Sequence, residues 1–136
     1  MVNLLGTFLC SKAVLPDMIN RKSGSIINIS SLAADERDEG TVPTGVAYAV
    51  SKAGLDRFTL GLATEVGRHN IAVNALKPHR VVDTDGMRLW QPDADKSEWQ
   101  SAEMMIKAAV LLACQDSKGI TGTIATDREI CTWHGL

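Results

Sequence analysis

Apolar residues along this chain of 136 residues follow two different spacings. Over residues 2–20 and again over 46–68 they recur at steps of three and four, which predicts two amphipathic helices. Between these helices, residues 25–30 form a short β-branched run that is typical of a buried strand. Pro16 interrupts the first helical pattern, so we expect it to kink that helix or to lie near its end.

The rest of the chain continues this alternation. Residues 71–76 predict a second buried strand, and residues 119–125 predict a third. A helix over residues 98–114, for which Ser97 is the expected N-cap, separates these two strands. Residues 78–95 contain Gly, Pro and Asp without a clear period, and we expect a long loop there, with a short helix at residues 86–90.

The order of the helices and strands indicates the fold. Strands that alternate with helices form parallel sheets through right-handed crossovers, with helices on both faces. We therefore predict an α/β fold with about three parallel strands, as a single domain over residues 1–136. Ligands of such sheets bind beyond the carboxyl ends of the strands, where Ser31 and residues 78–84 fall.

The composition argues against several classes of function. A net charge of −2 and 4% aromatic residues give little support for nucleic-acid binding. No apolar run approaches the ~18 residues of a membrane helix, so we expect no membrane association. Cys10, Cys114 and Cys131 lie far apart and lack metal-ligand spacing, which favours the reducing cytoplasm. The three histidines are equally dispersed, and we expect no metal site.

Tyr48 and Lys52 are four residues apart at the start of the second predicted helix, so they share one face of it. A phenol exchanges protons poorly at neutral pH, and a nearby cation lowers the pKa of a phenol toward the range of efficient acid–base catalysis. The alternative is a half-buried Tyr and a Lys whose stem covers apolar surface, which requires no catalysis.

Four segments, taken together and in this order, resemble the C-terminal half of a short-chain dehydrogenase/reductase. They are residues 2–8, 24–31, 48–54 and 73–78, and the similarity runs from residue 1 to about 126. The resemblance implies part of a Rossmann-like, doubly wound parallel sheet. It also implies an NAD- or NADP-dependent oxidoreductase that interconverts a small-molecule carbonyl and an alcohol by hydride transfer.

The resemblance implies roles for individual residues. Tyr48 corresponds to the general acid/base of the family, and Lys52 to the residue that assists it and holds the nicotinamide ribose. Ser31 corresponds to the residue that orients the substrate, although a Ser pair after a strand also suits a simple turn. Asn3 corresponds to the residue that helps retain a water in the proton relay.

The resemblance extends to cofactor contacts and assembly. Pro78 and Thr84 fall near the nicotinamide-facing segment of the family. The family commonly dimerises through the helices that correspond to residues 2–20 and 46–68, so we expect a homo-oligomer.

Departures from the family pattern define a second hypothesis. The 136 residues contain no Gly-rich phosphate turn, so we expect a truncated chain that binds NADH or NADPH weakly or not at all by itself. Ser31 and Tyr48 are seventeen residues apart, several more than usual, because of an acidic excursion at residues 35–40. His79 replaces the Gly of the usual Pro-Gly, and Thr84 is one residue late. The alternative function is a catalytically silent fragment that acts only in association.

Near the end of the chain, Thr126-Asp127-Arg128 stands where the family usually has Asp-Gly-Gly.

Overall fold

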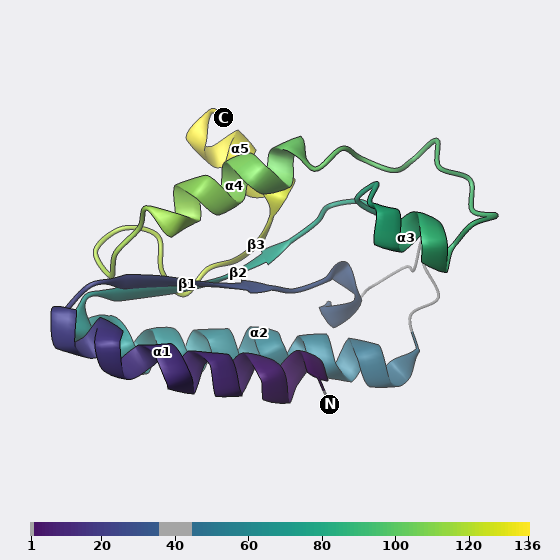
Figure 1. Ribbon diagram of the computed structural model, residues 1–136. Coiled ribbons are helices and arrows are strands. Elements are labelled where there is room, and N and C mark those ends of the chain that lie inside the picture. The colour runs from purple at the N-terminus through teal and green to yellow at the C-terminus, as the bar shows by residue number, and fades with distance from the viewer. Residues whose placement is uncertain (1, 36–44) are drawn as a thin grey trace.

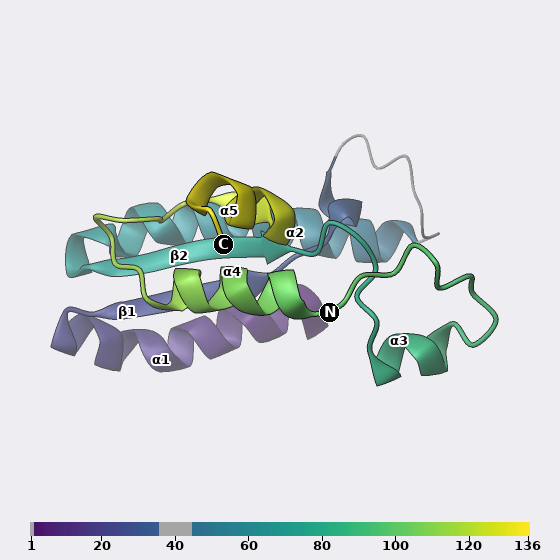
Figure 2. The same cartoon turned by 90° about the horizontal axis from the view of Figure 1, so that it is seen from above.

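Helices cover both faces of a parallel sheet in the computed structural model, which describes residues 2–35 and 45–136 (Figure 1). Helices α1 and α2 lie on one face, and α4 and α5 lie on the other (Figures 1 and 2). The predicted α/β architecture is therefore confirmed. In chain order the helical elements are a π-helical turn (Val2–Gly6), α1 (Thr7–Arg21), a 3-10 turn (Leu32–Ala34), α2 (Val46–Val66), a second 3-10 turn (Gly67–His69), α3 (Asp85–Trp90), α4 (Glu103–Ala113) and α5 (Asp127–His134).

Three parallel strands make the sheet, in the order β1 (Gly24–Ile29), β2 (Ile71–Lys77) and β3 (Ile124–Thr126). The register places Gly24 opposite Ile71 at the start of the first pair. All seven residues of β2 are buried, as expected for a central strand that is covered on both faces.

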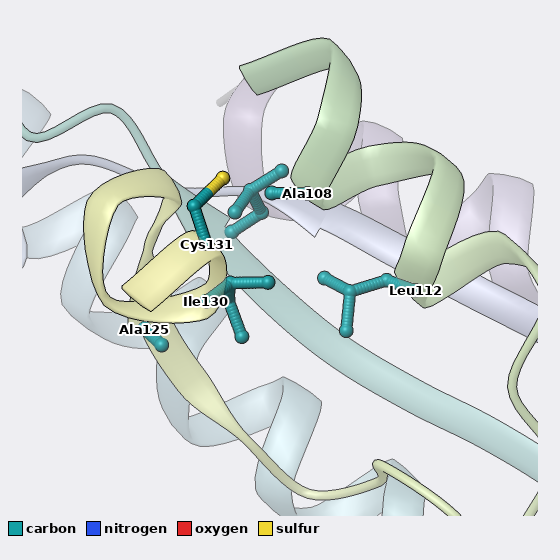
Figure 3. Close-up of a cluster of buried hydrophobic side chains, with 6 residues drawn as sticks. Ala108, Leu112, Ala125, Ile130 and Cys131 are labelled. Carbon is teal, nitrogen blue, oxygen red and sulfur yellow. The ribbon is translucent and has the colours of Figure 1, made fainter. Parts of the chain in front are cut away.

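Two hydrophobic clusters lie on opposite faces of β2. Figure 3 shows the cluster between the sheet, α4 and α5, which consists of Leu76, Ala108, Leu112, Ala125, Ile130 and Cys131. The second cluster lies between α2 and the sheet and consists of Leu62, Ala63, Val66, Ile71 and Val73. Because the branched and small side chains of β2 point alternately to the two faces, one strand serves both clusters.

The first helical stretch runs from Val2 to Arg21 and is 20 residues long, with Pro16 inside α1. Its mean hydropathy of 1.3 makes it long and apolar enough to cross a membrane by length and composition, so the expectation that no run approaches this length was wrong. A core helix passes the same test, although only 6% of this stretch is buried. In the structure, Leu15 and Ile19 pack against the second cluster.

Strand β1 is less enclosed than the sequence predicted. Ile29 is 49% exposed, and most of the strand is only half-buried. Within residues 2–35 and 45–136, β1 pairs with β2 on one side and with no strand on the other. The unpaired side is lined in part by Thr7, Cys10 and Val14 of α1.

Helix α4 begins at Glu103, so the predicted start at residue 98 and the predicted N-cap at Ser97 were wrong. Residues before α4 have other backbone partners. Gln100 N donates to Val81 O at 2.8 Å, and Asp83 N donates to Gln100 O at 2.8 Å. This isolated bridge extends the chain where a helix would otherwise begin.

The last strand is shorter than predicted, because only Ile124–Thr126 forms regular ladder pairs. Gly122 has a φ of +67°, which is a left-handed conformation that interrupts an extended run. Thr121 Oγ1 still accepts a hydrogen bond from Val73 N at 3.1 Å, so a side chain replaces a ladder bond before the strand begins.

Helix α5 was not predicted, although the sequence carries its start signal. Glu129 N donates to Thr126 Oγ1 at 3.1 Å, and Thr126 N donates to Glu129 Oε2 at 2.8 Å. This reciprocal pair is a capping box, which satisfies two donors at the helix start. Ile130 and Cys131 of this helix pack into the hydrophobic cluster between the sheet and α4.

We expect Thr126→Ala to lower the free energy of unfolding by about 1 kcal/mol, because Glu129 N loses its acceptor Thr126 Oγ1 and the bond from that hydroxyl to Glu129 Oε2 is lost as well. Urea denaturation followed by circular dichroism measures the change. The matched control is Thr132→Ala, which removes the hydroxyl of an exposed residue inside the same helix. Equal effects of the two substitutions would contradict the capping role.

Candidate functional site

Tyr48 and Lys52 lie in the first turns of α2, beside the end of β1. Lys52 Nζ donates to Ile29 O at 2.7 Å, and the same nitrogen lies 5.7 Å from the centroid of the Tyr48 ring. The spacing of four residues thus places both side chains on one face of the helix, as predicted. Tyr48 remains 37% exposed, so a ligand can reach its hydroxyl.

Burial lowers the pKa of Lys52, and the nearby carboxylate of Asp56 opposes this effect. Asp56 follows Lys52 by one helical turn and is itself buried. A lysine in such surroundings remains a cation that is easier to deprotonate than a solvated one. An easily deprotonated cation suits a residue that assists proton transfer.

Ser31 directly follows the buried Ser30, just beyond the carboxyl end of β1. Its Oγ accepts a hydrogen bond from Ala33 N at 3.2 Å and so caps the short 3-10 turn. The simple turn that was the alternative for this Ser is therefore present. The hydroxyl still has a proton to donate, because its described bond uses only a lone pair.

Asn3 lies in the π-helical turn Val2–Gly6, a rare geometry that is frequent at functional sites. Its Nδ2 donates to Ser51 Oγ at 3.1 Å, and Ser51 Oγ donates to Tyr48 O at 2.7 Å. The start of the first helical stretch is thus tied to the turn that carries Tyr48 and Lys52. The structure brings three of the four predicted catalytic residues into one connected group.

Pro78 and Thr84 follow β2 on the same edge of the sheet, but they differ in their surroundings. Pro78 directly follows the last residue of β2. Thr84 is exposed and caps α3, where its Oγ1 accepts from Met87 N at 3.2 Å. No hydrogen bond among the described residues joins Thr84 to Tyr48 or Lys52.

His79 and Asp127, which both depart from the family pattern, contact each other. His79 donates from its backbone N to Asp127 Oδ1 at 2.9 Å, and its Nδ1 lies 2.8 Å from the same oxygen. Gln100 Nε2 donates to the other oxygen of Asp127 at 2.7 Å. Asp127 is completely buried, so its carboxylate joins the turn after β2 to α5 and to the bridge before α4. No local pattern in the sequence predicts this contact.

A second charged cluster was also missed. Lys77, the last residue of β2, contacts the carboxylates of Asp35 and Asp56. Burial alone would lower the pKa of Lys77, but the hydrogen bonds and charges of Asp35 and Asp56 outweigh it and raise that pKa. Of the acidic excursion at residues 35–40, only Asp35 belongs to the described part of the chain.

The described residues hold no group of three or more His, Cys, Asp or Glu side chains that could bind a metal.

Comparison with known proteins agrees with this fold. A family model described as "short chain dehydrogenase" matches residues 1–95. The 3-oxoacyl-[acyl-carrier-protein] reductase FabG of Chlamydia trachomatis is 37% identical over 131 residues, which cover 90% of this chain and 50% of that protein. The 5-keto-D-gluconate 5-reductase of Escherichia coli (strain K12) is 31% identical over 130 residues, which cover 89% of this chain and 50% of that protein.

Solved structures show the same likeness. The crystal structure of a gluconate 5-dehydrogenase from Burkholderia cenocepacia J2315, in complex with NADP and tartrate, has a TM-score of 0.76 at 27% identity. The match covers 92% of this chain and 51% of that one. The chain belongs to the short-chain dehydrogenase/reductase family. It spans about half the length of the curated relatives it matches.

We expect Asp127→Ala to lower the free energy of unfolding by at least about 2 kcal/mol, because His79 and Gln100 would keep buried donors without an acceptor. Urea denaturation of the purified chain measures the loss. Asp93→Ala, which removes an exposed carboxylate, is the control and should change stability little. A loss of similar size in both variants would show that the buried contact has no special weight.

Proposed function

We propose that this chain carries the catalytic part of an NAD(P)-dependent oxidoreductase that interconverts a carbonyl and an alcohol. The observation that carries the proposal is the placement of Lys52 between Ile29 O and the Tyr48 ring at the carboxyl end of β1. Membership of the short-chain dehydrogenase/reductase family supports it.

The donors at the site suit a substrate oxygen and a ribose. An ammonium group has three N–H donors, and Ile29 O takes one from Lys52, which leaves two for ribose hydroxyls. Tyr48 would exchange the proton with the substrate oxygen, and Ser31 would donate to the same oxygen. Asn3 would hold the turn of Tyr48 in place through Ser51 and contribute to a water-linked proton path.

A bound nicotinamide cofactor would supply the hydride, and the chain's own residues would position it and move the proton. Pro78 and Thr84 are the proposed neighbours of the nicotinamide end. The 136 residues contain no Gly-rich turn to hold a pyrophosphate, so we assign the adenine side to residues outside this sequence. The relative solved with NADP supports a cofactor of this class.

We also propose a cytoplasmic location and a single, partial domain over residues 1–136. The three cysteines are free, and Cys10 and Cys114 are exposed, which suits a reducing compartment.

We expect Tyr48→Phe to reduce turnover by a factor of about 10² or more while cofactor affinity stays nearly unchanged, because Phe keeps the ring but has no proton to exchange. The assay joins this chain to the unmatched part of the E. coli 5-keto-D-gluconate 5-reductase, since this chain covers only 50% of that protein. It follows NADPH and NADH oxidation with a panel of carbonyl compounds.

The matched control is Thr64→Val, which removes a hydroxyl from an exposed position of the same helix. Lys52→Met should weaken cofactor binding and turnover together. Wild-type turnover in the Phe variant would contradict the assignment of Tyr48 as acid/base.

Association is a separate proposal, and it is also the alternative function should the chain prove catalytically silent. Helices α1 and α2 leave between them a groove of about 480 Å³, lined in part by Phe8, Leu15, Phe58 and Gly61. Phe8 is 47% exposed although its ring packs on that of Phe58. We propose that a second copy covers this face through residues 2–20 and 46–68.

The charges at the groove suit pairing of a surface with itself. Lys12 of α1 and Glu65 of α2 both line it and have opposite signs. In a two-fold interface the same surface patch of each copy contacts the other. Lys12 of each copy can therefore pair with Glu65 of the other copy, which gives two ion pairs.

We expect Gly61→Gln to shift the chain from dimer toward monomer in sedimentation velocity over a hundredfold dilution series. An added Cβ at Gly61 meets only Arg57 Nη1, at 3.9 Å, so the single chain accommodates the side chain while the groove is filled. Gly86→Gln in α3 is the matched control, because nothing lies within 4 Å of its added Cβ. A wild-type chain that is monomeric at every concentration would refute the proposal.

A further inference from the structure

Four charged side chains alternate in sign beneath the candidate site. Lys52 and Asp56 are one turn apart on α2, and Asp56 Oδ2 lies 2.9 Å from Lys77 Nζ. Lys77 also contacts Asp35 on the segment after β1. The side chains of Lys77 and Asp56 are 5% and 12% exposed, whereas Asp35 is 47% exposed. The formal charges of the four groups cancel, and only the Asp35 end faces solvent to a large extent.

Asp56 has two cations within reach and is hydrogen-bonded to one of them. Lys77 Nζ pairs with Asp56 Oδ2, while Lys52 Nζ donates to Ile29 O instead. The second oxygen of Asp56, Oδ1, is buried and has no hydrogen-bond partner among the described residues. An unpaired buried acceptor next to a flexible ammonium is a competing site for that ammonium.

We infer that Asp56 and Lys77 are positioning residues for Lys52: Lys77 holds the Asp56 carboxylate, so that the Lys52 ammonium stays on the Ile29 carbonyl beside Tyr48. The inference rests on the proposed function, in which Lys52 serves the reaction from that place.

The physical reason is the cost of a buried charge without a partner. Without Lys77, the Asp56 carboxylate would keep a single neighbouring cation, Lys52, and the ammonium would move one turn along the helix to pair with it. Such a move would break the bond to Ile29 O and take the ammonium away from the phenol. With Lys77 in place, Asp56 still acts on Lys52 as a nearby negative charge without binding it.

The groups that face Lys52 come from three elements. Tyr48 and Asp56 belong to α2, Ile29 O to β1, and Lys77 acts from β2 through Asp56. A change of charge at Lys77 therefore affects Lys52 through the Asp56 carboxylate. Removing the charge of Lys77 should raise the pKa of Lys52.

The test is the titration of individual lysines in the 136-residue chain by NMR with ¹³Cε-labelled lysine. Lys77→Met should raise the pKa of Lys52, since the freed Asp56 carboxylate pairs with it. Asp56→Asn should lower that pKa, and Lys77→Arg should leave it near the wild-type value. Lys107→Met is the matched control, because it removes the cation of an exposed ion pair with Glu103 at 3.1 Å and should not affect Lys52.

One measurement needs no substitution within the cluster. In the wild-type chain, Lys52 should lose its proton at lower pH than Lys77, because burial prevails at Lys52 and two carboxylates prevail at Lys77. The reverse order would overturn the inference even if Lys77→Met failed to fold. So would an unchanged Lys52 titration in folded Lys77→Met and Asp56→Asn variants. The readout requires neither cofactor nor substrate, so its failure is distinct from a failure of the turnover assay.

Discussion

Burial of β2 on both faces is the constraint on which the rest of the structure depends. Its side chains contribute to the cluster under α4 and α5 and to the cluster under α2, so both layers of helices pack against it. A central strand of this kind has every backbone group paired or covered and tolerates few polar side chains. It includes two, Asn74 and Lys77, and each has two polar partners among the described residues.

The partners of these polar residues organise the two ends of the strand. Asn74 accepts from Thr123 N and donates to Ile120 O, which holds the approach to β3 together with the backbone bonds from Gly122 N to Val73 O and from Ala75 N to Thr123 O. Lys77 gathers carboxylates from two other segments at the carboxyl end. Strand β2, which is buried by apolar contacts on both faces, therefore also determines where Lys77 and its two carboxylate partners lie.

Local pattern predicted most of the scaffold. The helical period over residues 2–20 and 46–68 and the β-branched runs were sufficient for the parallel fold, because each is a property of neighbouring residues. The same holds for the common face of Tyr48 and Lys52, which follows from their spacing alone. The order of four short segments identified the family.

What local pattern missed depends on contacts between distant segments. The start of α4 is delayed because Gln100 pairs with residues almost twenty positions earlier. The bond between His79 and Asp127 joins residues 48 positions apart, and the cluster around Lys77 draws on three segments. Only the cap of α5 was legible in the sequence, as Thr126 followed by Glu129 three residues later.

The bond between Lys52 and Ile29 O also protects the sheet. Ser30 N donates to Leu76 O, and because consecutive residues of a strand face opposite neighbours, the carbonyl of Ile29 faces the side of β1 on which the described residues provide no partner strand. Lys52 Nζ donates a hydrogen bond to that carbonyl. Natural sheets use lysines at open edges to prevent unwanted strand addition. The residue proposed to serve the chemistry thus also takes up a backbone acceptor that would otherwise be open to pairing on this side of β1.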